Sequence, residues 1–226
     1  MNGLVYIISA PSGSGKSTLV NELRKSVKNL DFSISYTTRP PRGSEQDGRE
    51  YFFVTREQFK TMIDRDEFLE HAEVFGNYYG TARKFLQEAQ ARGNDLLLDI
   101  DVQGERLIKR KLPEAISIFI LPPSRSVLEQ RLRRRSQAEG VNSDEVIQRR
   151  LNTASKEIAN YPNYDYILVN DQLEKSIDQL KAIVLYERMK RSGAAQNGDQ
   201  ERKLAEECLQ ANVRPRLAPI LASFAI

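Results

Sequence analysis

The stretch from residue 9 to residue 18, Ser-Ala-Pro-Ser-Gly-Ser-Gly-Lys-Ser-Thr, constrains the fold of this chain more than any other. It follows the apolar run 4–8, which is typical of a buried parallel strand, and it leads into helical spacing of Leu19, Val20 and Leu23. A strand, a glycine-bearing turn and a helix start form a cradle for phosphate, because backbone N–H groups and the helix N-terminus both favour an anion. We therefore expect a nucleotide phosphate to bind here.

The residues of this turn form the expected binding site for the phosphates of ATP. Gly13 and Gly15 permit backbone angles that aim successive N–H groups inward. Lys16 would reach the β- and γ-phosphates, and the hydroxyl of Ser17 would be a ligand of Mg²⁺. The expected ATP-binding residues of the turn are Ser12, Gly13, Ser14, Gly15, Lys16, Ser17 and Thr18.

The turn departs from the usual phosphate-loop pattern at its first position. That pattern opens with glycine, and this chain has Ala10 there. The two later glycines, the lysine and the serine keep their spacing, so we expect the loop to close. The alternative is a Gly/Ser turn without a ligand, and the preceding strand argues against it.

Length and composition limit the class of protein. The chain has 226 residues, 40% hydrophobic and 29% charged, as expected for one α/β domain with excursions from its sheet. A net charge of +3 is too small to indicate nucleic-acid binding by itself. The single cysteine, Cys208, excludes an internal disulfide, and with one histidine, His71, no zinc site is expected. Without a membrane-length apolar stretch or a signal-peptide pattern, we expect a cytoplasmic protein with no membrane contact.

Further strands and helices alternate along the chain. Runs at 94–100, 116–121 and 166–170 are typical of buried strands. The expected helices cover 17–28, 103–111, 124–138, 143–160 and 173–190. This alternation predicts an α/β fold with a mostly parallel sheet and helices on both faces.

Residues 35–85 interrupt this alternation and predict a small inserted lobe. The lobe has a turn at 39–43, a short strand at 50–54, a helix over 55–65 with Thr55 as its N-cap, and strands at 68–74 and 77–80. An insertion of this kind in a phosphate-loop fold usually carries the second substrate.

The tail from residue 191 to residue 226 has a different character. Residues 192–198 resemble a linker, and 199–211 are expected to form a short helix. The prolines within 214–219 are expected to break any regular element. We assign this tail no role from its sequence.

Five segments together resemble the guanylate kinases of the bacterial type. They are Ser-Tyr-Thr-Thr-Arg-Pro-Pro-Arg at 35–42, Gly-Arg-Glu-Tyr-Phe-Phe-Val at 48–54, Gly-Asn-Tyr-Tyr-Gly-Thr at 76–81, Leu-Asp-Ile-Asp-Val-Gln-Gly at 98–104 and Val-Asn-Asp at 169–171. The resemblance covers about residues 3–190 in one colinear order. It implies a phosphate-loop kinase that transfers the γ-phosphate of ATP to GMP with Mg²⁺, giving ADP and GDP.

The resemblance also implies a division of the chain. Residues 1–190 would be the guanylate kinase-like domain, with its core at 1–34 and 86–190. The GMP-binding lobe would span 35–85, and a helical lid would span about 125–150. The substrates would be small molecules, GMP or dGMP and ATP, with no nucleic-acid partner. The choice between GMP and dGMP, the oligomeric state and any regulation stay open.

An arginine pair beside a proline turn indicates a site for the acceptor phosphate. Arg39 and Arg42 flank Pro-Pro, so their guanidinium groups can clamp one phosphate. Tyr51 and Tyr79 can each donate a hydrogen bond to the same group. The resemblance assigns these four residues to the GMP phosphate, and Glu45 to holding the arginines. A solvated arginine pair is the alternative.

The guanine base calls for a carboxylate. Its N1–H and N2–H₂ groups can both donate to one carboxylate, whereas the N1 acceptor of adenine would be repelled. The resemblance makes Glu70 this carboxylate, although an isolated glutamate is more often an ordinary surface acid. Ser35 and Thr81 would add hydroxyls. Asp99 and Asp101 complete the expected GMP-binding set, and one of them would reach Mg²⁺ through water.

A cluster of arginines at 131–135 and 149–150 predicts the lid. Arg131 and Arg135 are four residues apart and share one helix face. The resemblance assigns Arg131, Arg135 and Arg150 to the ATP and transferred phosphates, and it leaves Arg133 and Arg134 facing solvent. With Lys16, these three arginines are the expected catalytic residues, and Asn170 is expected near the adenine of ATP. A nucleic-acid patch is the alternative interpretation of the cluster.

The lid region departs from the family pattern in two ways. The family often has glycine near positions 134 and 136, where this chain has Arg134 and Ser136. The connection between the two basic helices is longer and contains Gly140. Arg149 could therefore replace Arg150 as the lid arginine.

Other functions fit the sequence less well. A non-catalytic guanylate-kinase-like module of a scaffold protein would usually lack the phosphate-loop residues Lys16 and Ser17. A kinase for AMP, UMP or dTMP would not need an acid with hydroxyls at the base site. A phosphate-loop GTPase would need no arginine and tyrosine lobe. Paired carboxylates could indicate glycosidase chemistry, but the phosphate loop beside them argues against it.

Overall fold

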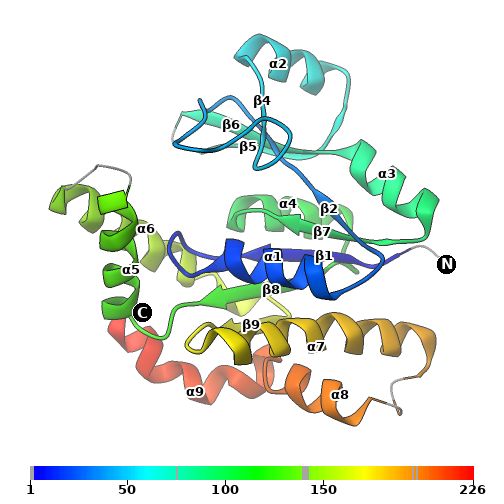
Figure 1. Cartoon of the computed structure of the whole chain (residues 1–226), viewed down its shortest axis with the longest axis vertical. Coiled ribbons are helices and arrows are strands. Elements are labelled where there is room, and N and C mark those ends of the chain that lie inside the picture. Colours follow the sequence, from blue (N-terminus) through cyan, green and yellow to red (C-terminus); the bar gives the residue numbers. More distant parts are fainter. Residues whose placement is uncertain (1–2, 75, 139–142, 195, 197) are drawn as a thin grey trace. The chain divides into compact units, whose positions relative to one another are not determined.

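The computed structural model describes residues 3–74, 76–138, 143–194, 196 and 198–226 (Figure 1). Gly140 and part of the expected linker at 192–198 therefore lie outside the described residues. The chain divides into two compact units. The first contains residues 1–8 and 28–116, and the second contains residues 9–27 and 117–226.

A five-stranded sheet has the strand order β2-β7-β1-β8-β9. Its strands are β1 (Val5–Ser9), β2 (Leu30–Ser33), β7 (Asp95–Asp99), β8 (Ile116–Leu121) and β9 (Tyr166–Val169). The pairs β1/β7, β2/β7 and β8/β9 are parallel, which confirms the predicted α/β class. Every residue of β8 is buried, as expected for a strand with a continuous apolar run.

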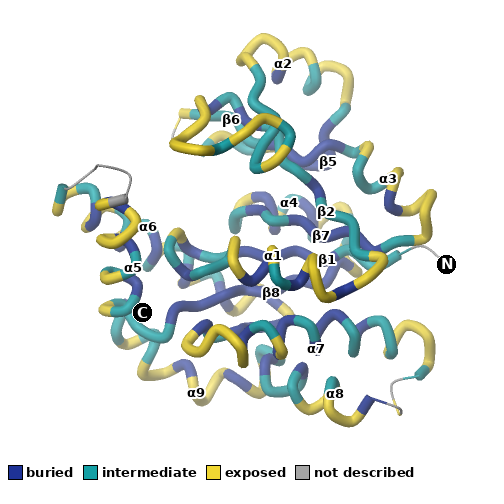
Figure 2. Tube along the Cα trace, in the orientation of Figure 1, coloured by how far each residue is buried: buried dark blue, intermediate teal, exposed yellow. Residues whose placement is uncertain are grey.

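The first unit also holds a four-stranded sheet of order β4-β3-β6-β5. Its strands are β3 (Tyr36–Thr37), β4 (Phe52–Phe53), β5 (Phe68–Val74) and β6 (Asn77–Ala82). Helix α2 (Arg56–Asp64) begins with the expected cap, because the Thr55 hydroxyl accepts from Gln58 N and the Gln58 side chain accepts from Thr55 N. Its one buried residue, Phe59, stacks on Phe68 and Tyr78 of this sheet, while most of α2 is exposed (Figure 2).

Two further helices complete the first unit. They are α3 (Arg83–Arg92) and α4 (Val102–Lys111). Helix α3 was not among the predicted helices, nor were strands β2 and β3 among the predicted strands. Only Ala89 of α3 is buried, so its apolar periodicity is weak.

The second unit contains seven helical segments among its described residues. They are α1 (Lys16–Ser26), α5 (Arg125–Ala138), α6 (Asp144–Ile158), the short 3₁₀ helix η1 (Tyr161–Asn163), α7 (Leu173–Ser192), α8 (Asp199–Glu206) and α9 (Gln210–Ser223). Helix α7 packs on both α1 and α8. Within the described ranges, no helix combines the length and apolar character needed to cross a membrane.

The prediction that residues 214–219 break regular structure is wrong. Helix α9 continues through Pro215 and Pro219. Each proline removes one helical hydrogen bond, and the freed carbonyls of Ala211 and Pro215 belong to exposed residues that water can reach. Burial of Val213 and Leu217 on the other face favours the helix.

Candidate active site

The glycine-rich turn in the second unit has the backbone that phosphate binding needs. Gly13 and Gly15 have φ of +90° and +89°, a region that residues with a side chain rarely adopt. Gly15 precedes α1 as its N-cap residue, and Lys16 is the first residue of the helix. The exposed side chains of the turn are Ser12, Ser17 and Thr18, whereas Ser14 is buried.

Position 10, where this chain has alanine, does not require glycine in this fold. Among the described residues, the non-glycine positions with positive φ are Asn29, Asp66 and Ala225. Ala10 is therefore in an ordinary backbone conformation, and the departure from the family pattern causes no backbone strain.

Two side chains from distant parts of the second unit hold the turn at Ser14. The Asn170 Nδ2 donates to the Ser14 carbonyl at 2.7 Å, and the Arg131 guanidinium reaches the same carbonyl at 3.4 Å. Arg131 also donates to the Asn170 carbonyl at 3.0 Å. Asn170, expected near the adenine of ATP, is thus buried and in contact with the phosphate loop. A Cβ atom on Gly15 would lie 2.3 Å from the Asn170 Nδ2, so this approach needs glycine.

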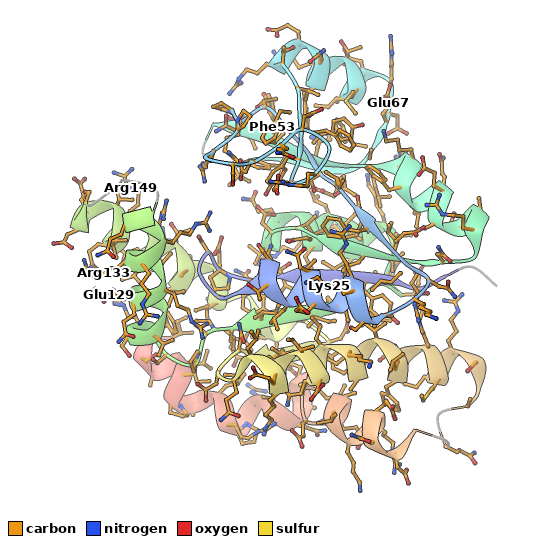
Figure 3. The ribbon with its side chains drawn as sticks, in the orientation of Figure 1. Lys25, Phe53, Glu67, Glu129, Arg133 and Arg149 are labelled. Atoms are coloured by element: carbon orange, nitrogen blue, oxygen red, sulfur yellow. The ribbon has the colours of Figure 1, made fainter. Side chains whose placement is uncertain are left out.

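The arginines of the expected lid lie on helices α5 and α6 and differ in their contacts. Arg150 is half-buried and donates to the Ser136 hydroxyl at 3.3 Å, whereas Arg149 is exposed and lies 3.6 Å from Glu145 of its own helix. Arg133 is exposed as expected, but it pairs with Glu129 at 2.8 Å and Asp144 at 2.5 Å, as Figure 3 shows for Glu129.

These contacts show which arginines lie toward the neighbouring helix and the phosphate loop. Of the two candidates on α6, Arg150 is the one directed toward α5, and Arg149 extends from the outer side. Arg134 and Arg135 are exposed. The structure brings Arg131 to the phosphate loop, and Arg135 follows it by one turn of α5.

The first unit holds the residues expected to bind the acceptor phosphate. Arg39 is only 6% exposed, and its guanidinium lies 2.9 Å from the Glu45 carboxylate and over the ring of Tyr51. Burial disfavours its charge, but the Glu45 carboxylate outweighs burial, so the pKa of Arg39 lies above its ordinary value. Glu45 also accepts from the backbone N–H of Arg42 at 2.8 Å. This carboxylate therefore fixes the turn that carries both arginines.

Two tyrosines lie beside this arginine. The rings of Tyr51 and Tyr79 meet edge to face with centroids 6.0 Å apart, and both side chains are half-buried. Tyr79 also favours the charged form of Arg39. The exposed Arg42 completes the expected set, so this cluster combines two cations with two phenol groups around one turn.

Glu70 on β5 is a buried acid. It is 5% exposed, and the Thr81 hydroxyl of the neighbouring strand β6 donates to it at 2.7 Å. Burial raises the pKa of Glu70 to about 7, and the nearby Asp101 acts in the same direction. An ordinary surface acid would be exposed, so this alternative does not apply to Glu70.

The two aspartates lie at the carboxyl end of β7. Asp99 is the last residue of that strand and pairs in register with Ile8 of β1. Asp101 caps α4, because its Oδ1 accepts from Gln103 N at 3.0 Å and Gly104 N at 2.8 Å. Ser35 is half-buried between β2 and β3, and its carbonyl accepts from Phe52 N.

Sequence reasoning gave no role to two residues that shape this half of the site. A Cβ on Gly104 would lie 3.2 Å from the Glu70 Oε2, so glycine leaves room beside the carboxylate. The Thr37 hydroxyl accepts from Arg39 N at 3.1 Å and donates to the Tyr78 carbonyl at 3.0 Å. Both residues belong to the segments quoted above, but their contacts reach across the fold.

The geometry provides two sets of groups for anionic ligands. One is built on backbone N–H groups at the start of a helix, and the other on arginine, tyrosine and carboxylate side chains, of which Arg39 and Glu70 are buried. No group of three or more acidic, histidine or cysteine residues suited to a metal occurs in the part of the chain that the structure describes. A metal ion here would therefore depend on oxygen ligands from a bound phosphate.

Comparisons with known proteins agree with one another. The sequence model of a family described as guanylate kinase matches residues 2–187, which ends before α8 and α9. A guanylate kinase from Koribacter versatilis is 61% identical over 227 residues, covering 99% of this chain and 97% of the relative. A guanylate kinase from Escherichia coli strain K12 is 49% identical over 199 residues, covering 87% of this chain and 94% of the relative.

A solved structure is similar as well. The crystal structure of guanylate kinase from Anaplasma phagocytophilum superposes with a TM-score of 0.70 at 34% sequence identity. The match covers 88% of this chain and 95% of that one.

Proposed function

This chain belongs to the guanylate kinase family and phosphorylates GMP with ATP, and on that premise we propose how its residues divide the work. The donor ATP is held by the turn at 12–18. The acceptor GMP is held by the side chains of the first unit. GMP binds to the lobe at 35–85, and the helices of the lid at about 125–150 contact the phosphates of ATP.

The donor phosphates bind to backbone N–H groups and to Lys16. Gly13 and Gly15 have the φ values that aim N–H groups at an anion, and the start of α1 adds partial positive charge. Arg131, Arg135 and Arg150 neutralise the oxygens of the phosphate in transfer.

Magnesium fits this donor half. The Ser17 hydroxyl is exposed at the start of α1, and Mg²⁺ usually takes one or two protein oxygens together with substrate phosphates. We propose that Ser17 is the protein ligand and that the ion supplies charge neutralisation on the phosphates.

The acceptor phosphate binds to Arg39, Arg42, Tyr51 and Tyr79. Glu45 holds the guanidinium of Arg39 and the backbone of Arg42, so both cations are positioned before the substrate arrives. A phosphate oxygen of GMP is already ionised and can attack the γ-phosphorus without a general base. The new P–O bond forms as the bond to the β-phosphate oxygen breaks, giving GDP and ADP.

The buried Glu70 is the observation on which the choice of guanine as the base rests. Its carboxylate would accept from N1–H and N2–H₂ of guanine, while the Thr81 hydroxyl donates to its Oε1 and fixes that oxygen. Asp101 offers a further acceptor, and Ser35 and Asp99 complete the acceptor set. Adenine presents an acceptor at N1, which a carboxylate would repel.

The setting of the enzyme follows from its substrates. We propose a small-molecule enzyme in the cytoplasm that acts on GMP and ATP, with no nucleic-acid partner. The single cysteine supports a reducing compartment.

Glu70→Gln tests the base assignment. The amide would place an N–H₂ group against donor groups of guanine, so the KM for GMP should rise about 10²-fold while the KM for ATP changes little. Initial rates with GMP, dGMP, AMP, UMP and dTMP as acceptors measure this effect. Glu73→Gln, an exposed acid on the same strand, is the matched control and should behave like the unmodified enzyme. Lys16→Ala gives the background without transfer.

One result would contradict the assignment. If Glu70→Gln keeps the same preference for GMP over AMP and the same KM for GMP, another group reads the base.

A further inference from the structure

The last turn of α9 lies on the two helices that carry the phosphate-binding arginines. Figure 1 shows the C-terminus beside α5, and α9 packs on α5 as well as on β9. The backbone N–H of Arg125, the first residue of α5, donates to the Ser223 hydroxyl at 3.0 Å. The first N–H groups of a helix have no partner within the helix. A residue 98 positions away therefore supplies part of the α5 cap.

The Ser223 hydroxyl is oriented for this contact. It donates its own hydrogen to the Ile220 carbonyl at 2.6 Å, so its lone pairs are available to the Arg125 N–H. Ser124, just before α5, caps Val127 N at 3.2 Å. The first turn of α5 thus takes one cap from the adjacent residue and one from the C-terminal turn.

The neighbouring residue Phe224 reaches the other helix. Its side chain is only 4% exposed, and its carbonyl accepts from the hydroxyl of Ser155 on α6 at 3.4 Å. Residues 223 and 224 therefore join the start of α5 to the last turn of α6. The rest of α9 is anchored by the buried Val213 and Leu217.

These contacts can set the positions of the arginines, because they hold the helices that carry them. Arg131 and Arg135 lie on α5, and Arg150 lies on α6. A helix is stiff over the six residues from Arg125 to Arg131, a rise of about 9 Å, so a shift at its first turn moves the guanidinium groups. Misplacement of a catalytic group by about 1 Å can cost about 10²-fold in rate.

We propose that Ser223 and Phe224 are positioning residues for phosphate transfer, acting through α5 and α6 on the three arginines. This inference rests on the proposed roles of those arginines. The family match ends at residue 187, so these positioning contacts come from a part of the chain beyond it.

Two truncated chains test the proposal, one ending at Ala222 and one ending at Phe224. The first lacks both positioning residues, and the second removes only the exposed Ala225 and Ile226. The chain ending at Ala222 should show a KM for ATP about tenfold higher and an unchanged KM for GMP. Hydrogen exchange at the first-turn amides of α5 should also become faster. The chain ending at Phe224 should match the full chain in all three measurements.

Point variants keep the test decisive if the shorter chain does not fold. Ser223→Ala removes the cap and should raise the KM for ATP about threefold, with faster exchange at Arg125. Ser223→Thr keeps the hydroxyl and should restore both values. A structural effect on folding alone would lower the amount of active enzyme without changing either KM.

The outcomes separate this inference from the assignment of the arginines. If Arg131→Ala leaves the KM for ATP and the rate unchanged, the assignment of the arginines fails. If Arg131→Ala loses activity while Ser223→Ala and both truncated chains keep the KM for ATP of the full chain, the positioning inference alone is overturned. Faster exchange in α5 with an unchanged KM for ATP overturns it as well.

Discussion

The two halves of the proposed site differ in the groups that they offer to a nucleotide. The donor half uses a contiguous turn whose backbone angles at Gly13 and Gly15 present N–H groups. The acceptor half uses side chains from β3 to α4, and its central groups, Arg39 and Glu70, are buried. A backbone site accepts any suitable polyphosphate and depends on conformation. A side-chain site selects one base and depends on charge and protonation.

The largest effect should come from a change of conformation in the donor half. Gly15→Ala would force a side chain into φ of +89° and place its Cβ 2.3 Å from the Asn170 Nδ2. The contact between Asn170 and Ser14 would break, so kcat/KM for ATP should fall roughly 10³-fold. The dissociation constant of GMP, measured by calorimetry, should not change.

Gly193→Ala is the matched control for this variant. Gly193, just after α7, also has positive φ, at +74°, but a Cβ there would meet no atom within 4 Å. Its activity should stay within about twofold of the unmodified enzyme. Equal losses in the two variants would show that positive φ alone, and not the contact with Asn170, limits the donor half.

A smaller effect should follow from exchanging one cation in the acceptor half. Arg39→Lys keeps the positive charge but removes the planar group that reaches Glu45 and a phosphate together. We expect kcat/KM for GMP to fall about 30-fold with the KM for ATP unchanged, measured by initial rates. Arg92→Lys, at an exposed pair with Asp31, is the control. A matching fall in ATP affinity would contradict the division into two independent halves.

A pH dependence should also appear, confined to the acceptor half. In the proposed site, guanine binds the carboxylate form of Glu70, whose pKa is about 7 in the free enzyme. As pH falls below 7, Glu70 takes up a proton, so kcat/KM for GMP should drop up to tenfold for each pH unit. Initial rates measured from about pH 5.5 to about pH 8.5 give the slope.

Glu70→Gln separates this slope from the titration of GMP itself. The second pKa of a phosphate monoester is about 6, and its contribution persists in the variant. An identical slope in both enzymes would exclude Glu70 as its source.

The same pKa predicts the effect of pH on stability. The pKa of Glu70 in the folded protein lies above its ordinary value of 4.5, so its protonated form favours folding. The stabilisation is complete below that ordinary value and is lost as pH rises through about 7, a change of about 3 kcal/mol. Glu70→Gln should therefore raise the melting temperature of the free enzyme more at pH 8 than at pH 5.

The donor half could be predicted from the sequence more fully than the acceptor half, because the groups of the donor half are contiguous in the chain. A strand, glycines at fixed spacing and a helix start identify the phosphate loop within ten residues. The hydrogen bond that holds the loop at Ser14 could not be predicted, because its donor, Asn170, is 156 positions away in the sequence. Glu70 needed the family resemblance, since nothing local shows that an acid is buried.

The fold shows the same limit. The long apolar run of β8 was predicted with its exact bounds, and Thr55 was predicted as a cap from its own neighbours. Helix α3 buries only Ala89, so its pattern is weak. Helix α9 contradicts the local rule for proline, because packing of Val213 and Leu217 outweighs two lost hydrogen bonds.

Strand β9 is the last in its sheet, and the segment between α8 and α9 covers its open side. Ile167 N donates to the Cys208 carbonyl at 2.7 Å, and Gln210 N donates to the Asp165 carbonyl at 3.0 Å. An uncovered edge strand is a template for aggregation with other chains. The residues from Cys208 to Gln210 therefore occupy backbone groups of this edge strand that would otherwise be open to pairing with another chain.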